Sequence, residues 1–222
     1  MEHLSEKYNL ELEQGIEQKV KVLANNCHQF VTDDNLKLLF KCLDLTSLNT
    51  NDTRKDIAAI IDKVNGLKHK YPEMPSIGAV CFYPPFVSQA KQTLEDEGVH
   101  VASVGANFPT SQTFLNVKKT ECKDIIQHGA DEVDIVISVY KFLEGEYEEV
   151  FEEIKEIKEV IGNKKLKVIL ETGMLNDYEN IQLASLIAME AGADFIKTST
   201  GKEKPAATYD AVYIMAQAVR AF

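Results

Sequence analysis

Short, β-rich apolar segments alternate along this chain with longer segments of helical periodicity, and the pattern occurs six times. The β-rich segments are Lys41–Leu45, Ser76–Tyr83, Val99–Asn107, Glu132–Val139, Lys165–Glu171 and Asp194–Thr200. Alternation of this kind predicts parallel strands that are joined by right-handed helical crossovers. Two layouts satisfy it, a (β/α) barrel and an open, doubly wound sheet.

The choice between these layouts depends on motifs and on the pattern within the strands. Doubly wound sheets usually bind nucleotides, yet neither GxGxxG nor GxxxxGK[ST] occurs in the sequence. No Pro/Gly/Ser-rich linker divides the 222 residues, a length typical of one domain. We therefore predict an α/β fold of the (β/α)8 TIM-barrel type over residues 41–222, with six βα units present, after an N-terminal helical extension over residues 1–40.

Charge and cysteine content exclude several classes of protein. A formal charge of −11 argues against binding to nucleic acid or to anionic membranes. The acidic N-terminus does not resemble a signal peptide, and no apolar run approaches the ~18 residues of a membrane span. The four cysteines form no CxxC pair, which argues against a disulfide framework or a zinc site. We expect a reducing, cytoplasmic environment.

Charged residues alternate with aliphatic residues in several of the predicted strands. In Glu132–Val139, the aliphatic residues at 133, 135 and 137 alternate with Asp134. Successive side chains of a strand point to opposite faces, so the aliphatic face suits packing against helices. The other face then directs charged side chains into the interior, namely Asp44, Asp134, Lys167 and Lys197.

Buried charges of this kind point to chemistry more than to structure. A buried charge is costly unless it is paired, and Lys167 and Lys197 lie on adjacent predicted strands, about 4.8 Å apart. Two close ammonium groups disfavour each other's protonation, and burial acts in the same direction. We therefore predict that one lysine is held as a neutral amine, which is a nucleophile near neutral pH. A structural polar core is the alternative.

Other polar groups form no catalytic constellation. The five histidines are scattered, and no Ser/His/Asp or Cys/His set can be assembled. The acidic run EEVFEEIKEIKE at residues 148–159 predicts the solvated face of a helix with Glu-to-Lys pairing, not a metal site.

The segment AGADFIKTSTGK at residues 191–202 resembles the active-lysine strand of the deoxyribose-phosphate aldolase family. These are class I aldolases with a (β/α) barrel fold. Further stretches agree in order and spacing: LDLTSLN (43–49), AVCFYP (79–84), GADEVDIV (129–136) and LKVILETG (166–173). The resemblance extends from about residue 40 to the end of the chain.

The resemblance implies a role for each matching position. Lys197 corresponds to the Schiff-base lysine, Asp134 to a carboxylate that relays protons with a water, and Lys167 to a lysine that lines the same site. The remaining matches correspond to substrate-binding positions: Asp44, Thr46 and Cys81 near the sugar, and Thr200, Gly201 and Lys202 toward the phosphate.

The implied reaction is the reversible cleavage of 2-deoxy-D-ribose 5-phosphate to glyceraldehyde 3-phosphate and acetaldehyde. It requires no metal and no organic cofactor. The implied partners are the small phosphosugar and a second copy of the chain in a homodimer, with self-association through open sheet edges as an alternative.

The sequence departs from the family after the sixth unit. The family continues with a seventh strand of the type GFKPAGG, whose lysine lowers the pKa of the Schiff-base lysine and whose glycines help to hold phosphate, and with an eighth strand that also binds phosphate. This sequence ends at Phe222 without either strand. A truncated fragment, an early stop and closure by a second chain are the explanations we consider. We expect open sheet edges that favour association, and little or no activity of this chain alone.

Two other functions stay open from the sequence. One is a different Schiff-base barrel enzyme, such as a transaldolase-like protein, which would be trapped by dihydroxyacetone and not by acetaldehyde alone. The other is a non-catalytic folded fragment, which neither aldehyde nor ketone would trap.

Overall fold

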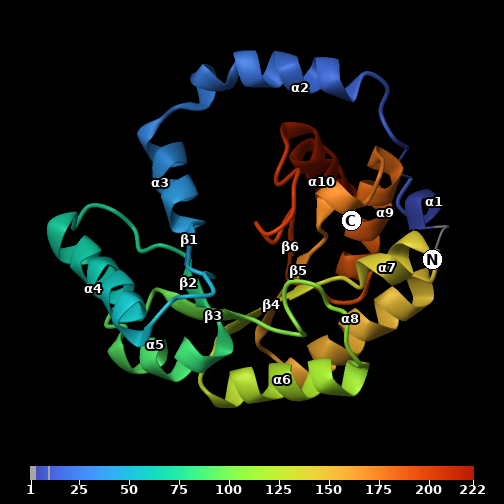
Figure 1. The fold of residues 1–222 in the computed structure, drawn as a ribbon. Coiled ribbons are helices and arrows are strands. Elements are labelled where there is room, and N and C mark those ends of the chain that lie inside the picture. Colours follow the sequence, from blue (N-terminus) through green and yellow to red (C-terminus); the bar gives the residue numbers. More distant parts are fainter. Residues whose placement is uncertain (1–3, 10) are drawn as a thin grey trace.

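The computed structural model describes residues 4–9 and 11–222, and its described part is built around one parallel sheet (Figure 1). The strands lie side by side in chain order. They are β1 (Asp44–Thr46), β2 (Ala79–Phe82), β3 (His100–Val104), β4 (Glu132–Val136), β5 (Lys165–Ile169) and β6 (Phe195–Lys197). Every neighbouring pair is parallel.

The strand order decides between the two predicted layouts. A doubly wound sheet reverses its strand order at a switch point, whereas a (β/α) barrel keeps chain order throughout. The order β1-β2-β3-β4-β5-β6 has no reversal, so the fold is of the TIM-barrel type, with the described residues forming part of a barrel. The prediction is confirmed. Each strand is shorter than the apolar segment that predicted it, because the segment ends continue as turns.

Helices follow the strands on the outside of the sheet (Figure 1). They are α4 (Arg54–Lys70), α5 (Val87–Thr93), α6 (Leu115–Gln127), α7 (Val139–Leu143), α8 (Tyr147–Ile161), α9 (Tyr178–Glu190) and α10 (Tyr209–Ala221), with 3₁₀ turns η2 (Pro84–Phe86) and η3 (Thr172–Met174). Two helix ends have local causes in the sequence. Thr53 caps α4 through a capping box with Asp56, and α8 ends at Gly162, whose φ of 63° suits a residue without a side chain.

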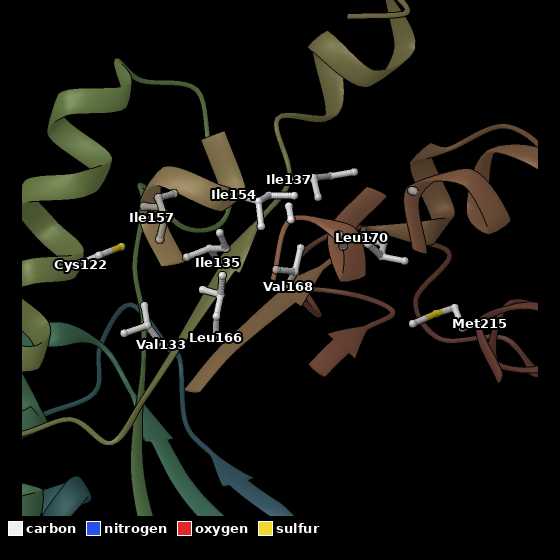
Figure 2. Close-up of a cluster of buried hydrophobic side chains, with 14 of the residues drawn as sticks. Cys122, Val133, Ile135, Ile137, Ile154, Ile157, Leu166, Val168, Leu170 and Met215 are labelled. Atoms are coloured by element: carbon white, nitrogen blue, oxygen red, sulfur yellow. The ribbon is translucent and has the colours of Figure 1, made fainter. Parts of the chain in front are cut away.

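The core lies between the outer face of the sheet and these helices. Figure 2 shows aliphatic residues of β4 and β5 pointing toward α8 and α6. Val133 and Ile135 alternate with Asp134, and Leu166 and Val168 flank Lys167, as the parity of the sequence predicts. All four aliphatic side chains are buried. Because this face is closely packed, the alternate side chains of each strand must point to the opposite, inner face.

The N-terminal helices α1 (Leu4–Lys7), α2 (Ile16–Asn25) and α3 (Asp33–Lys41), with the 3₁₀ turn η1 (Cys27–Phe30), run in an arc from α9 and α10 to β1 (Figure 1). Lys7 and Tyr8 bind Glu190 of α9, and the Tyr213 hydroxyl of α10 donates to Glu13 over 2.6 Å. The arc carries exposed apolar side chains, namely Val22, Leu23, Phe30, Val31, Leu36, Leu38 and Leu39.

Within the described residues, none of the helices has the length and apolar character to cross a bilayer.

A buried ion pair joins α6 to α8. The ammonium of Lys118 donates to Ser111 (2.9 Å), Ser138 (2.8 Å) and Glu153 (3.1 Å), and only 1% of its side chain is exposed. Burial lowers the pKa of Lys118, and the charge of Glu153 opposes this shift. The prediction that the acidic run of α8 is solvated is therefore wrong at Glu153, which faces α6 and ties the loops after β3 and β4 to the helices.

Replacement of Lys118 tests this ion pair. Lys118→Met leaves Glu153 buried with fewer partners, and we expect the free energy of unfolding to fall by about 2–4 kcal/mol. Lys155→Met is the matched control, because Lys155 pairs with Glu152 on the exposed side of α8 and should leave stability nearly unchanged. Urea unfolding of both variants measures the difference, and equal small effects would contradict it.

Candidate active site

The inner face of the sheet brings together the four charged residues that the sequence predicts to point inward. Asp134 on β4 is in register with Lys167 on β5, and Lys197 ends β6 beside Ile169. The Lys197 Nζ lies 2.5 Å from Asp134 Oδ2 and 3.8 Å from Asp44 Oδ2. The Lys167 Nζ lies 2.6 Å from Asp44 Oδ2 and 4.0 Å from Asp134 Oδ1. The four side chains thus form one cluster of ion pairs.

Burial differs sharply between the two members of the Lys197–Asp134 pair. The Asp134 side chain is 1% exposed, whereas the Lys197 side chain is 31% exposed. The Lys197 side chain is therefore partly open to solvent, while its partner carboxylate is not. A small molecule that approached the amine would meet a polar group already shielded from bulk water, where electrostatic interactions are strong.

The charge state of Lys197 differs from the expectation. Burial alone lowers the pKa of this amine, but the charge of Asp134 and its hydrogen bond outweigh burial and raise the pKa above its ordinary value. The prediction that a neighbouring lysine keeps one amine neutral is wrong in this structure, because carboxylates from β1 and β4 offset the second ammonium. Burial also raises the pKa of Asp134, against the pull of both lysines. Asp134 is thus suited to take a proton from its partner.

Glu132 is part of the cluster, although sequence reasoning did not select it. It lies two residues before Asp134 and therefore points to the same face of β4. Its carboxylate binds Lys167 and lies 2.6 Å from His100 Nδ1. The signal was present in the sequence, since Glu132 has the parity of Asp134.

Cys81 and Thr46, two of the predicted substrate-binding residues, lie on neighbouring strands. Cys81 is buried on β2 within a patch of small side chains that includes Ala79 and Ala102. Burial raises the pKa of its thiol, which keeps it neutral at physiological pH. Thr46 is exposed at the end of β1, where its hydroxyl donates to the Asp44 carbonyl over 3.2 Å. Small neutral groups thus line the inner face beside the charged cluster.

The predicted phosphate residues Thr200, Gly201 and Lys202 lie in the loop after β6, apart from the charged cluster. The Thr200 hydroxyl donates to Glu171 Oε2 over 2.5 Å, and its backbone N–H donates to Glu171 Oε1 over 3.2 Å. Lys202 donates to the Leu48 carbonyl. Glu171 is a second residue that sequence reasoning missed: its φ of 52° is left-handed, which no pattern of side chains reveals.

Close backbone packing holds this loop against the end of β5. A Cβ added to Gly173 would lie 2.1 Å from the Pro205 carbonyl oxygen, so the site tolerates only glycine. Together with Glu171, this contact fixes the course of the chain after Thr200.

Asp194 anchors the start of β6, the strand that carries Lys197. Its carboxylate accepts hydrogen bonds from Lys158 (2.6 Å), Lys165 (2.9 Å) and the Leu166 N–H (2.9 Å). Partial burial alone would raise the pKa of Asp194, but these donors outweigh it and lower the pKa to about 2. The three contacts join α8, β5 and β6.

The low pKa of Asp194 predicts a pH-dependent contribution to stability. A carboxyl whose pKa is lower in the folded state stabilises the fold above its unfolded pKa, and this stability is lost as pH falls toward the folded value. We expect Asp194→Asn to reduce the free energy of unfolding by about 2 kcal/mol at pH 7, and by progressively less between about pH 5 and pH 2. Urea unfolding at several pH values measures this, and a pH-independent difference would contradict it.

Known proteins are similar to this chain over the part that contains these residues. The model of the DeoC/LacD family aldolases matches residues 38–222. A deoxyribose-phosphate aldolase of Bos taurus is 37% identical over 196 residues, which cover 82% of this chain and 60% of the bovine protein. One from Caldicellulosiruptor saccharolyticus is 40% identical over 186 residues, covering 82% of this chain and 80% of that protein.

A solved structure shares the fold. The deoxyribose phosphate aldolase of Aeropyrum pernix, described as a tetramer, superimposes with a TM-score of 0.70 at 26% identity, covering 83% of this chain and 74% of that one. The chain spans about 60% of the length of its bovine relative. The match over residues 38–222 includes β1 through β6 and every residue of the charged cluster, and the chain therefore belongs to the DeoC/LacD family of aldolases.

Proposed function

We propose that this chain carries the active centre of a class I aldolase that reversibly cleaves 2-deoxy-D-ribose 5-phosphate, with Lys197 as the Schiff-base nucleophile. The observation that carries the proposal is the Lys197–Asp134 pair, in which a partly exposed lysine contacts a buried carboxylate. The names of the relatives support the substrate, since they are deoxyribose-phosphate aldolases.

The first step requires a neutral amine. Lys197 is paired with a carboxylate and its pKa is raised, so it must lose a proton before it attacks. Asp134 takes this proton, which its own raised pKa favours. The amine then adds to the C1 aldehyde of the open-chain sugar. Asp134 returns its proton to the hydroxyl of the carbinolamine, and loss of water gives an iminium ion and leaves Asp134 as a carboxylate.

The iminium ion is the electron sink for carbon–carbon cleavage. As the C2–C3 bond breaks, its electrons form an enamine on Lys197, and the C3 hydroxyl proton passes through water to the Asp134 carboxylate. Glyceraldehyde 3-phosphate leaves. The enamine carbon is then protonated, and water hydrolyses the resulting imine to acetaldehyde and free Lys197.

The remaining predicted residues bind the substrate in this scheme. Asp44, Thr46 and Cys81 line the path of the sugar, and Thr200, Gly201 and Lys202 take the phosphate. Loops that follow barrel strands commonly bind phosphate, and the Glu171 contacts hold this one in a single course.

Reductive trapping tests the nucleophile. With acetaldehyde and borohydride we expect one ethyl group to be fixed on Lys197, located by mass spectrometry of peptides. Lys197→Met should abolish this adduct, while Lys155→Met, at an exposed position on α8, should retain it. Trapping by dihydroxyacetone in place of acetaldehyde would support the transaldolase-like alternative, and no adduct at Lys197 would contradict the proposal.

We also propose that the chain forms a homodimer in a reducing, cytoplasmic environment. The exposed apolar side chains of α2 and α3 support association, and the four described cysteines are unpaired. Sedimentation velocity should give a dimer at micromolar concentration. Phe30→Glu with Leu39→Glu, which places charges on this apolar surface, should shift the species toward monomer. A wild-type monomer would contradict the expectation.

A further inference from the structure

Glu132 is a buried carboxylate that the proposed mechanism does not use. It begins β4 on the inner face, and its side chain is 7% exposed. One carboxylate oxygen pairs with the Lys167 ammonium, and the other lies 2.6 Å from Nδ1 of His100, a half-exposed side chain at the start of β3. A buried carboxylate is costly unless it is paired, so its position beside Lys167 needs a reason.

The two ammonium groups of the cluster have different nearest carboxylates. Lys167 contacts Glu132 and Asp44, and the next nearest carboxylate oxygen is Asp134 Oδ1 at 4.0 Å. Lys197 contacts the other oxygen of Asp134 at 2.5 Å. Without Glu132, Lys167 would retain Asp44 alone and would be free to close the remaining gap to Asp134.

The charge balance of the inner face depends on the same residue. The titratable groups that face the cluster are Asp44 of β1, Cys81 of β2, His100 of β3, Glu132 and Asp134 of β4, Lys165 and Lys167 of β5 and Lys197 of β6. The charge of Lys165 is offset by its contact with Asp194. Cys81 is a neutral thiol because burial raises its pKa. Three carboxylates therefore offset two ammonium groups, and loss of Glu132 leaves only two carboxylates to do so.

We propose that Glu132 is a positioning residue for the Schiff-base reaction: by holding the Lys167 ammonium, it reserves Asp134 for Lys197. The inference rests on the proposed role of Lys197 as nucleophile. It predicts opposite effects on two steps. If Lys167 moves to Asp134, Lys197 loses part of its pairing and is neutral more often, so the imine forms faster. Asp134, now bound to the Lys167 ammonium, which stays protonated, accepts and returns protons less readily.

Glu132→Gln separates these two steps. The neutral amine is the reactive form, so the rate of borohydride trapping with acetaldehyde should be roughly threefold to tenfold higher than in the wild type near pH 7, and its pH dependence should shift to lower pH. Proton transfer is followed by deuterium exchange into the acetaldehyde methyl group, measured by NMR. Exchange per unit of imine should fall about tenfold. Damage to the fold would lower both rates together.

Glu153→Gln is the matched control. Glu153 is also a buried glutamate that is paired with two lysines, Lys118 and Lys141, but it lies on the helical side of the sheet. This variant should lose stability and leave the pH dependence of trapping unchanged. A Lys167→Met background gives the second control, because Glu132→Gln should have no further effect once the ammonium that it holds is absent.

The outcomes separate this inference from the proposed function. If the wild type traps no acetaldehyde at Lys197, the proposed function fails, and this inference fails with it. If the wild type is trapped but Glu132→Gln leaves both rates unchanged, or if its effect persists in the Lys167→Met background, the inference alone is overturned. Should Glu132→Gln not fold, Glu132→Asp decides, because its shorter side chain keeps the charge and loses the reach to Lys167. It should then shift trapping in the same direction.

Discussion

The ion pair between Lys197 and Asp134 is the interaction on which the proposed chemistry of this protein depends. It combines a fully buried carboxylate with a lysine side chain that is partly exposed to solvent. Burial raises the pKa of Asp134, and Asp134 in turn raises the pKa of Lys197, so each group of the pair binds a proton more firmly than it would in water. Such a pair can release a neutral amine and keep the proton nearby, which is what Schiff-base chemistry requires.

The sheet makes this pair possible by dividing its two faces. The outer face carries aliphatic side chains that pack against α6 and α8, and this packing fixes which way the alternate residues point (Figure 2). The inner face carries small residues and charges. Polar anchors on the outer side reinforce the division, since Lys118 joins α6 to Glu153 on α8, and Asp194 joins α8 and β5 to β6. Lys197 is therefore held by a rigid strand.

Carboxylates, more than lysines, set the electrostatics of the inner face. Counting Lys167 and Lys197 alone predicts mutual repulsion and a neutral amine, which is wrong. Lys167 is bound by Asp44 of β1 and Glu132 of β4, so carboxylates from two separate strands offset its charge. Glu171 acts in a similar way beyond the strand ends, where it holds Thr200.

The sequence by itself determined the alternation of strands and helices and the inward parity of Asp134, Lys167 and Lys197, because these follow from local periodicity and from the period of two along a strand. It also carried the likeness to the aldolase family. Only the tertiary structure decided which carboxylate pairs with which lysine, that Glu153 is buried, and that Glu171 is left-handed. Those facts depend on distances between strands and on the packing of one helix against another, which periodicity within a single segment does not encode.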